Sequence, residues 1–278
     1  MGVAQVIVET FEAARDYERE RRRRSENGDL PPRRDLRYEA ILEILEGKRD
    51  VHAHSYRADE ILMLLRVAEQ LGFRVQCFQH VLEGYKVASE IARHGAGAST
   101  FSDWWAYKYE VIDAIPHNGA ILHEHGVVAS FNSDDAELAR RLNLEAAKAV
   151  RYGDLPEQEA LRLVTLNPAI QLGIADRVGS LELGKDADFV VWSGHPLSTY
   201  SVCEQTWIEG RKFFDRAADL ERREVVVAER DALVAKARAR REEEEEKEKE
   251  ENEKAPPEGE EADEPPAALP ALAAEGRR

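Results

Sequence analysis

Four glycines divide the first half of the chain into units of similar length. Gly47, Gly72, Gly95 and Gly126 are 25, 23 and 31 residues apart, which is the length of a strand plus a crossover helix. The stretches before them carry apolar residues at three and four residue steps, and glycine after such a stretch can adopt the left-handed conformation that ends a helix. The spacing therefore predicts consecutive β/α units around a parallel sheet.

A run that favours strand structure follows each glycine. The four runs cover residues 49–54, 73–80, 97–102 and 127–132. The carboxyl ends of parallel strands meet at one rim, where α/β barrels build their active sites. Eight residues beyond the last three glycines stand His80, Asp103 and Asp134, and five residues beyond Gly47 stands His52. We therefore expect imidazole and carboxylate side chains to converge on one rim.

The composition separates a packed part from a solvated C-terminal part. With 278 residues and 43% hydrophobic content the chain can bury one sizeable core, whereas the 34% charged fraction is high. Residues 241–278 hold 15 acidic and 6 basic side chains, and prolines from Pro256 onward exclude a regular helix there. We expect a charged helix over residues 219–254 and a disordered tail over 255–278, with a solubilising role favoured over partner binding.

Charge and hydropathy exclude several classes of function. The net charge of −16 argues against a nucleic-acid surface, because phosphate binding needs clustered Lys and Arg. No run approaches the roughly 18 apolar residues of a membrane span, and the first twenty residues lack an apolar signal core. Cys77 and Cys203 form neither a disulfide framework nor a cysteine zinc site. We expect a cytoplasmic protein, without nucleic-acid or membrane partners, if Met1 is the true start.

The remaining segments complete a predicted division into five parts. Helices are expected at residues 3–24 and 37–45, on either side of the Pro31-Pro32 linker. Strand-like runs at residues 189–192, 202–208 and 211–214 follow a glycine-bounded turn, and Glu209-Gly210 is a hairpin signal. The predicted parts are an N-terminal helical segment (1–46), β/α units (47–178), a small β appendage (179–218), a charged helix (219–254) and a disordered tail (255–278).

The segment after the fourth unit resembles a known family. Residues 165–169 read Thr-Leu-Asn-Pro-Ala, residues 172–174 read Leu-Gly-Ile, and residues 176–190 read Asp-Arg-Val-Gly-Ser-Leu-Glu-Leu-Gly-Lys-Asp-Ala-Asp-Phe-Val. This run is similar to the closing signature of the metal-dependent amidohydrolase superfamily, most of all to its imidazolonepropionase-like branch. The resemblance extends from about Gly47 to Arg216. It implies an α/β fold containing about the last four β/α units of a (β/α)8 TIM-type barrel, followed by the β appendage.

The resemblance also implies a metal site and a reaction. It matches His52 and His80 to metal ligands at the ends of the fifth and sixth barrel strands, and Asp134 to a ligand and proton shuttle at the end of the eighth. Such donors suit a divalent metal, with zinc expected, that raises the acidity of a bound water. The implied activity is hydrolysis of an amide or cyclic-amide C–N bond in a small molecule. His54 stands two residues beyond His52 on the same strand face. The sequence favours a contact with substrate and a solvated polar role equally for this residue.

The chain departs from the family pattern before Gly47. The first strand of the family carries His-x-His, whereas His52 is the first histidine of this chain. Four units cannot close an eight-stranded barrel, and an open sheet edge would remain. We therefore expect either a truncated start or a partner chain or oligomer that completes the barrel. The alternatives are an inactive remnant that interacts through its acidic tail and, more weakly, a metal-independent sugar-binding or peptide-binding module.

The other conspicuous residues have ordinary explanations. His94, His123 and His125 stand at predicted helix ends, where imidazole interacts favourably with the helix dipole, and Asp135 is expected to cap the next helix. Asp103 fits the repeat but receives no ligand role. Two further histidines, His117 and His195, stand beside prolines in predicted loops. Four aromatic residues fit either the mouth of a pocket or packing under a loop: Trp104, Trp105, Tyr107 and Tyr109.

Overall fold

The structure is a computed structural model that describes residues 2–254, with side chains to residue 250. The chain divides after Ala217 into two compact units, which are taken separately. The helices are α1 (Gly2–Asn27), α2 (Leu36–Leu45), α3 (Ala58–Leu71), α4 (Ala88–His94), α5 (Asn118–Glu124), α6 (Ala136–Ala139), α7 (Leu142–Gly153), α8 (Glu157–Arg162), α9 (Leu166–Gln171) and α10 (Arg216–Lys254), with 3-10 turns η1 (Gly84–Val87) and η2 (Tyr109–Val111). The strands are β1 (Val51–Ser55), β2 (Val75–His80), β3 (Gly97–Thr100), β4 (Ala129–Phe131), β5 (Phe189–Trp192), β6 (Cys203–Ile208) and β7 (Arg211–Asp215).

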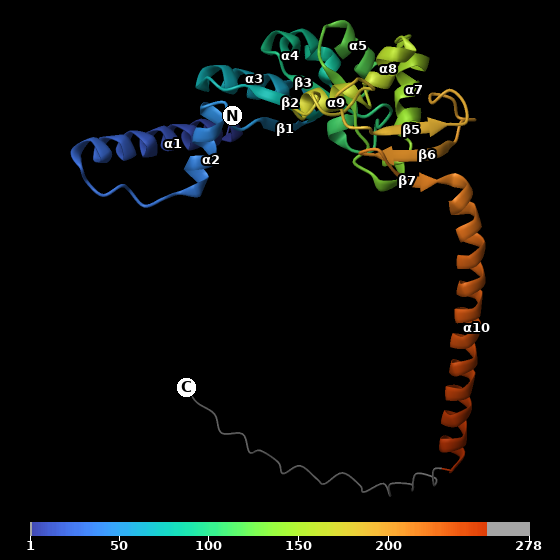
Figure 1. Ribbon diagram of the computed structural model, residues 1–278. Helices are drawn as coiled ribbons and strands as arrows, with labels where there is room; N and C mark the ends of the chain where they lie inside the picture. Colours follow the sequence, from blue (N-terminus) through green and yellow to red (C-terminus); the bar gives the residue numbers. More distant parts are fainter. Residues whose placement is uncertain (1, 255–278) are drawn as a thin grey trace, which may run out of the picture. The chain divides into compact units, whose positions relative to one another are not determined.

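The first four strands form one parallel sheet in the order β1-β2-β3-β4 (Figure 1). A helix follows each of the first three strands before the next begins, so the predicted mixed α/β chain with consecutive β/α units is confirmed. Gly72 and Gly95 end α3 and α4 at φ +73° and +80°, the left-handed conformation expected of them. The register aligns Ser55 with His80 and His80 with Thr100, which places these residues at one level of the rim.

The two faces of the parallel sheet differ in polarity. One face packs against α3, α4 and α5, and Phe11 of α1 joins this core by stacking on Phe73 at 4.8 Å. Because successive side chains on a strand alternate between faces, the other face carries the intervening residues. Its polar members are His52, His54, Gln79, Ser99 and Ser130. Both histidines of β1 therefore lie on the face turned away from the core.

The sheet has one edge that the chain closes and one that it leaves open. At β4, the Phe131 N–H donates to the Leu163 carbonyl at 2.9 Å, and Asn167 Nδ2 donates to the Ala129 carbonyl at 2.7 Å. Beside them, Gln171 Nε2 donates to the Val128 carbonyl at 2.6 Å. At the opposite end, β1 pairs only with β2 within residues 2–254. Its outer backbone groups have no strand partner in that part of the chain.

The three predicted strands after residue 188 form a separate antiparallel sheet in the order β5-β6-β7. Phe189 stacks on Trp207 across the first pair at 5.5 Å. Between β6 and β7, Glu209 and Gly210 have φ angles of +48° and +72°. Two positive φ angles in succession make a two-residue hairpin turn that matches the twist of its strands.

The second unit contains most of α10, a charged helix that ends at Lys254. Ion pairs one turn apart, such as Arg223 with Asp219 and Arg241 with Glu245, run along it, and such exposed pairs contribute only tenths of a kcal/mol each. The expected disordered tail, residues 255–278, lies outside the described residues. Within the described part of the chain, no helix has the length and apolar character needed to span a bilayer.

Candidate active site

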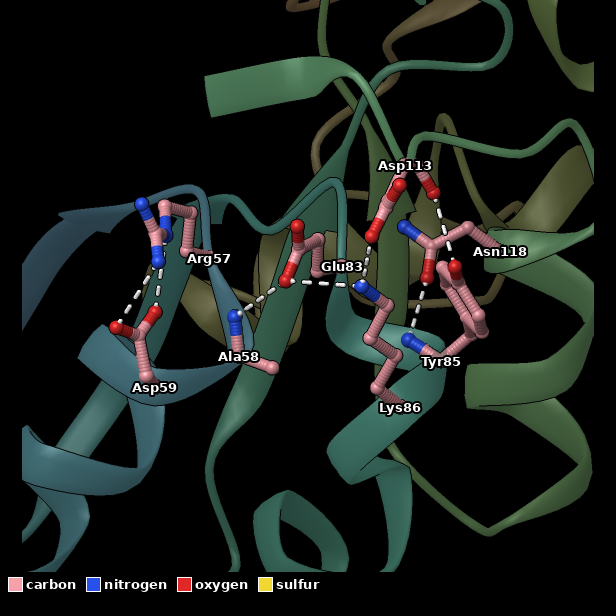
Figure 2. Close-up of polar contacts among 8 residues, drawn as sticks. All are labelled: Arg57, Ala58, Asp59, Glu83, Tyr85, Lys86, Asp113 and Asn118. Carbon is pink, nitrogen blue, oxygen red and sulfur yellow. Dashed lines mark hydrogen bonds and ion pairs between the residues drawn. The ribbon is translucent and has the colours of Figure 1, made fainter. Parts of the chain in front are cut away.

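A buried carboxylate ties together the loops at the carboxyl rim of the sheet. The side chain of Glu83, beyond the end of β2, accepts a hydrogen bond from the Ala58 N–H at 2.9 Å and so caps the first turn of α3 (Figure 2). Lys86 Nζ lies 3.3 Å from Glu83 Oε2 and 2.5 Å from Asp113 Oδ2. The loops that follow β1, β2 and β3 are thereby held in one arrangement.

Tyr85 and Asn118 extend this network to the start of α5. The Tyr85 hydroxyl donates to the Asp113 carbonyl at 2.9 Å, and the Tyr85 N–H donates to Asn118 Oδ1 at 2.8 Å (Figure 2). Asn118 Nδ2 in turn donates to the Val81 carbonyl at 2.8 Å and to Thr100 Oγ1 at 2.9 Å. Because Asn118 is fully buried, the network gives the rim a rigid foundation.

His80 stands at the centre of the candidate site. It is the last residue of β2, its exposed fraction is 5%, and its Nε2 lies 2.7 Å from His54 Nδ1. Its φ angle is +75°, a left-handed conformation that costs a non-glycine residue free energy and tends to occur where function requires it. Burial lowers the pKa of His80, His54 and Lys108 lower it further, and Asp134 opposes them. The neutral imidazole is therefore favoured, and that is the form that binds metals.

Aromatic rings stack on the His80 imidazole. Tyr56 does so at 5.0 Å and Phe101 at 5.2 Å between ring centroids. Trp104 stacks on Phe101 at 4.4 Å, and Tyr107 meets Trp104 edge-on at 5.6 Å. Of the two roles weighed for these aromatics, Trp104 packs under the loop, whereas Tyr107 is exposed.

Sequence reasoning missed two residues of this site, Tyr56 and Lys108. Lys108 Nζ lies 3.8 Å from the centroid of the Tyr56 ring, on which His80 also stacks. Tyr56 stands one residue beyond the strand end that His80 shares with Ser55, so the register alone would have placed it at the rim. For Lys108 no signal of this kind exists, because it lies in a long loop between β3 and α5.

His52 lies lower on its strand than His80 does. β1 continues to Ser55, and His52 is in register with Cys77, three residues before the rim and roughly 10 Å below it at about 3.3 Å per residue. Its Nδ1 is 3.1 Å from Gln79 Nε2. The structure thus brings His54, rather than His52, beside His80. The interval of eight residues that holds for the other glycines leads from Gly47 to Ser55, the register partner of His80.

Asp134 follows β4 by three residues and is exposed. Its φ angle is +43°, so it shares the left-handed conformation of His80. Its charge acts on the pKa of both His80 and Tyr107. The neighbouring Asp135 accepts hydrogen bonds from two N–H groups in the first turn of α6, at 2.9 and 2.8 Å, as predicted for a helix cap.

The remaining predicted polar residues have structural contacts. Asp103 forms a 2.6 Å ion pair with Lys148, which also contacts the buried Glu145 at 2.9 Å. The side chain of His94 is buried, and its Nε2 accepts a hydrogen bond from the Val75 N–H at 3.1 Å. His125 Nδ1 lies 2.9 Å from the Ile121 carbonyl, whereas His195 is exposed and lies 3.3 Å from Glu157. None of these histidines joins the group around His80.

The residues on the rim fit a metal in their chemistry, although they do not form a complete ligand set. Buried polar atoms without a hydrogen-bond partner are rare, and two of the three in the described residues, His80 Nδ1 and Asn132 Oδ1, stand at or next to strand ends of the rim. Neutral imidazoles and a carboxylate are ligands that a zinc-like ion prefers. Among residues 2–254, however, no three His, Cys, Asp or Glu side chains gather closely enough to hold an ion.

Comparison with known proteins shows a likeness to amidohydrolases over part of the chain. Residues 111–231, which include Asp134 but not the histidines of β1 and β2, match the model of the amidohydrolase family. The amidohydrolase tasK of Hapsidospora irregularis is 33% identical over 205 residues, which cover 72% of this chain and 21% of that protein. The urease subunit alpha of Yersinia pestis is 40% identical over 90 residues, 26% of this chain and 16% of that subunit.

Solved structures give the same result. An amidohydrolase from Thermotoga maritima superimposes with a TM-score of 0.72 and 34% identity, over 78% of this chain and 56% of that one. An adenosine deaminase from Xanthomonas campestris with bound zinc gives a TM-score of 0.50 at 20% identity, over 66% of this chain and 49% of that one, a likeness in fold alone. The chain spans about a fifth of tasK and little more than half of the Thermotoga protein. The predicted resemblance to the amidohydrolase superfamily is confirmed over part of the chain.

Proposed function

Since the chain carries an amidohydrolase-family domain over part of its length, we propose that it is a metal-dependent hydrolase of amide or cyclic-amide C–N bonds in small molecules. The observation that carries the proposal is the 2.7 Å contact between His54 and His80 at the carboxyl rim of a parallel sheet, with the Asp134 charge near enough to act on the pKa of His80. The left-handed backbone at both His80 and Asp134 supports it, because strain of this kind clusters at active sites.

The proposal includes a partial barrel. Four consecutive parallel strands with helices along one face are what half of a (β/α)8 barrel contains, and the polar face with His52 and His54 would be its interior. The open edge of β1 is where further strands would pair. We propose that they come from a partner chain, an oligomer or a longer form of this protein. The match of residues 111–231 to the amidohydrolase family model favours this hydrolase over an inactive remnant.

Each residue of the rim has a proposed role. His80, with His52 or His54 from β1 and with Asp134, would hold the ion, for which we propose zinc. The metal, when bound, supplies a water acidic enough to attack a carbonyl carbon near neutral pH. Asp134 would accept the proton of that water and return it to the leaving nitrogen. The Glu83 network would keep the rim loops in place, and the aromatic stack would keep bulk water from the His80 ring.

Metal content after purification tests the proposal. We expect the ratio of zinc to protein, measured by mass spectrometry of the elements, to fall sharply in His80→Ala. Comparing His52→Ala with His54→Ala shows which histidine of β1 is the ligand. His195→Ala, an exposed histidine away from the rim, is the matched control. Equal metal content in the parent protein and in all three rim variants would contradict the proposal.

A further inference from the structure

We propose that Lys108 is the residue that recognises substrate charge, and that the substrate is an amide carrying a carboxylate. This inference rests on the proposed function, because it assigns the substrate class of that same rim. For this role, the ammonium group of Lys108 must be able to bind an anion and must lie beside the reacting groups. The surface around it must also suit an organic ligand. The structure meets each requirement with residues near His80.

Lys108 differs from the other two lysines of the rim in its partners. Lys86 is held between Glu83 and Asp113, and Lys148 contacts Asp103 and Glu145. Lys108, in contrast, forms no ion pair with a carboxylate within the described residues. Its contacts are to tyrosines: Nζ lies 3.8 Å from the Tyr56 ring centroid and 5.6 Å from that of Tyr107. A hydrogen bond with the Tyr56 side chain raises the pKa of Lys108, and the charge of Glu110 also raises it. Of these three rim lysines, Lys108 is therefore the one that no carboxylate holds in an ion pair.

The Tyr56 ring connects Lys108 to the reacting groups. One contact of this ring, at 5.0 Å, is to the His80 imidazole, and another, at 3.8 Å, is to the Lys108 ammonium. Both Lys108 and Asp134 act on the pKa of His80. The cation thus stands a short molecule's length from the proposed hydrolytic residues. A carboxylate a few bonds from the scissile amide would span that separation.

The chemistry of this position favours a carboxylate over a neutral or cationic group. A hydrogen bond between an ammonium and a carboxylate is charge-assisted and roughly twice as strong as a neutral one. The exposed ring of Tyr107 offers apolar contact for the rest of the ligand. A cationic substrate would be repelled by the ammonium. The rim would accordingly select N-acyl amino acids over their uncharged amides.

Equilibrium binding to the full chain tests this inference with two probes that differ only in charge. The probes are N-acetylphenylalanine and its uncharged amide, titrated into the parent protein and followed by NMR. We expect the acid to bind about tenfold more tightly, the effect of one charge-assisted hydrogen bond. Lys108→Met should abolish the preference and Lys108→Arg should keep it. Lys48→Met, which removes an exposed lysine paired with Glu46, should leave it unchanged.

The outcomes separate this inference from the proposed function. A parent protein without preference, or a preference that persists in Lys108→Met, overturns the role of Lys108 even if the zinc-loaded protein hydrolyses both probes. A preference that depends on Lys108 upholds it even if no hydrolysis occurs with any metal, in which case the proposed function fails alone. Thermal unfolding of each variant checks the fold, and Lys108→Gln replaces the methionine variant if that one unfolds.

Discussion

The two ends of the parallel sheet differ in how the chain finishes them. At the closed end, the residues of β3 and β4 are all buried, and Leu163, just after α8, and Asn167 of α9 supply partners to the backbone of β4. At the open end, the first four residues of β1 alternate between half-buried and exposed, and within the described residues the strand pairs on one side only. Because local stability follows buried contacts and protected hydrogen bonds, we infer that the closed end holds the sheet together while the open end carries the histidines.

The difference also separates two uses of polar side chains. At the closed end, Gln171 and Asn167 satisfy backbone carbonyls and are themselves buried. At the open end, His52 and His54 are exposed, and their ring contacts are to other side chains. The first arrangement completes the fold. The second leaves imidazole nitrogens near the surface, where a ligand or a further strand can reach them.

The same substitution at the two ends should give the largest contrast. Gln171→Leu removes the hydrogen bonds to the Val128 carbonyl and from the Ser130 hydroxyl and leaves buried polar atoms unpaired. We expect the free energy of unfolding to fall by about 2–4 kcal/mol, since each such atom costs 1–3 kcal/mol. Gln79→Leu, which removes one exposed contact to His52, should cost less than about 0.5 kcal/mol.

Urea unfolding followed by tryptophan fluorescence measures both values. The four tryptophans lie between residues 104 and 207, so the signal reports the first unit. Equal losses in Gln171→Leu and Gln79→Leu would show that the closed end holds the sheet no more firmly than the open end.

Packing at the closed end provides a second test. Gly119 of α5 lies so close to Phe131 of β4 that an added Cβ would meet the ring at 2.6 Å. In most helices, Gly→Ala stabilises by up to about 1 kcal/mol. Here we expect Gly119→Ala to destabilise by about 1–3 kcal/mol, because the buried ring has little room to move. Thermal unfolding of the variant would decide, and any stabilisation would show that the packing there is loose.

The sequence predicted the strands better than it predicted how they end. The glycine spacing indicated four parallel strands because a strand and its helix have typical lengths and glycine ends a helix in a recognisable way. The sequence analysis put His52 at the end of its strand, but β1 runs on for three more residues, to Ser55. Only the pairing with β2 shows this. The closure of β4 by Gln171 and Asn167 had no local signal. Side chains that bond to a distant backbone leave no periodic pattern in the sequence.

The candidate site was predictable in its polar residues and unpredictable in its aromatic ones. His80 and Asp134 were identified because the repeat places them at strand ends, and in the structure the Asp134 charge opposes the lowering of the His80 pKa. The stacking of Tyr56 and Phe101 on His80 joins residues from different loops. Such contacts follow from tertiary packing alone. The long loop that brings Lys108 over Tyr56 likewise has no equivalent in the other units.

The Glu83 network offers a smaller contrast, within the rim itself (Figure 2). Glu83→Gln keeps an acceptor for the Ala58 N–H but removes the ion pair to Lys86 and the negative charge at the start of α3. We expect a loss of about 1 kcal/mol, because the carboxylate is buried and acts as a helix cap. Asp59→Asn, at the exposed pair with Arg57, should change stability by no more than a few tenths of a kcal/mol. Urea unfolding that gave the reverse order would contradict the structural role of this network.

The weakest expected effect concerns the strand next to the open edge. His94 accepts a hydrogen bond from the Val75 N–H at the start of β2, and only the neutral ring can do so. Burial lowers the pKa of His94, although Glu69 opposes the shift. The unfolded state then binds more protons, so this contribution to stability is present above the unfolded pKa of about 6.5 and is lost as the pH falls toward the folded value. In His94→Gln, the free energy of unfolding should fall less steeply between about pH 7 and pH 5 than in the parent, whereas the exposed His195→Gln should keep the parent slope. Identical slopes in all three proteins would show that β2 does not depend on this imidazole, and that the open end is held at its start by other contacts.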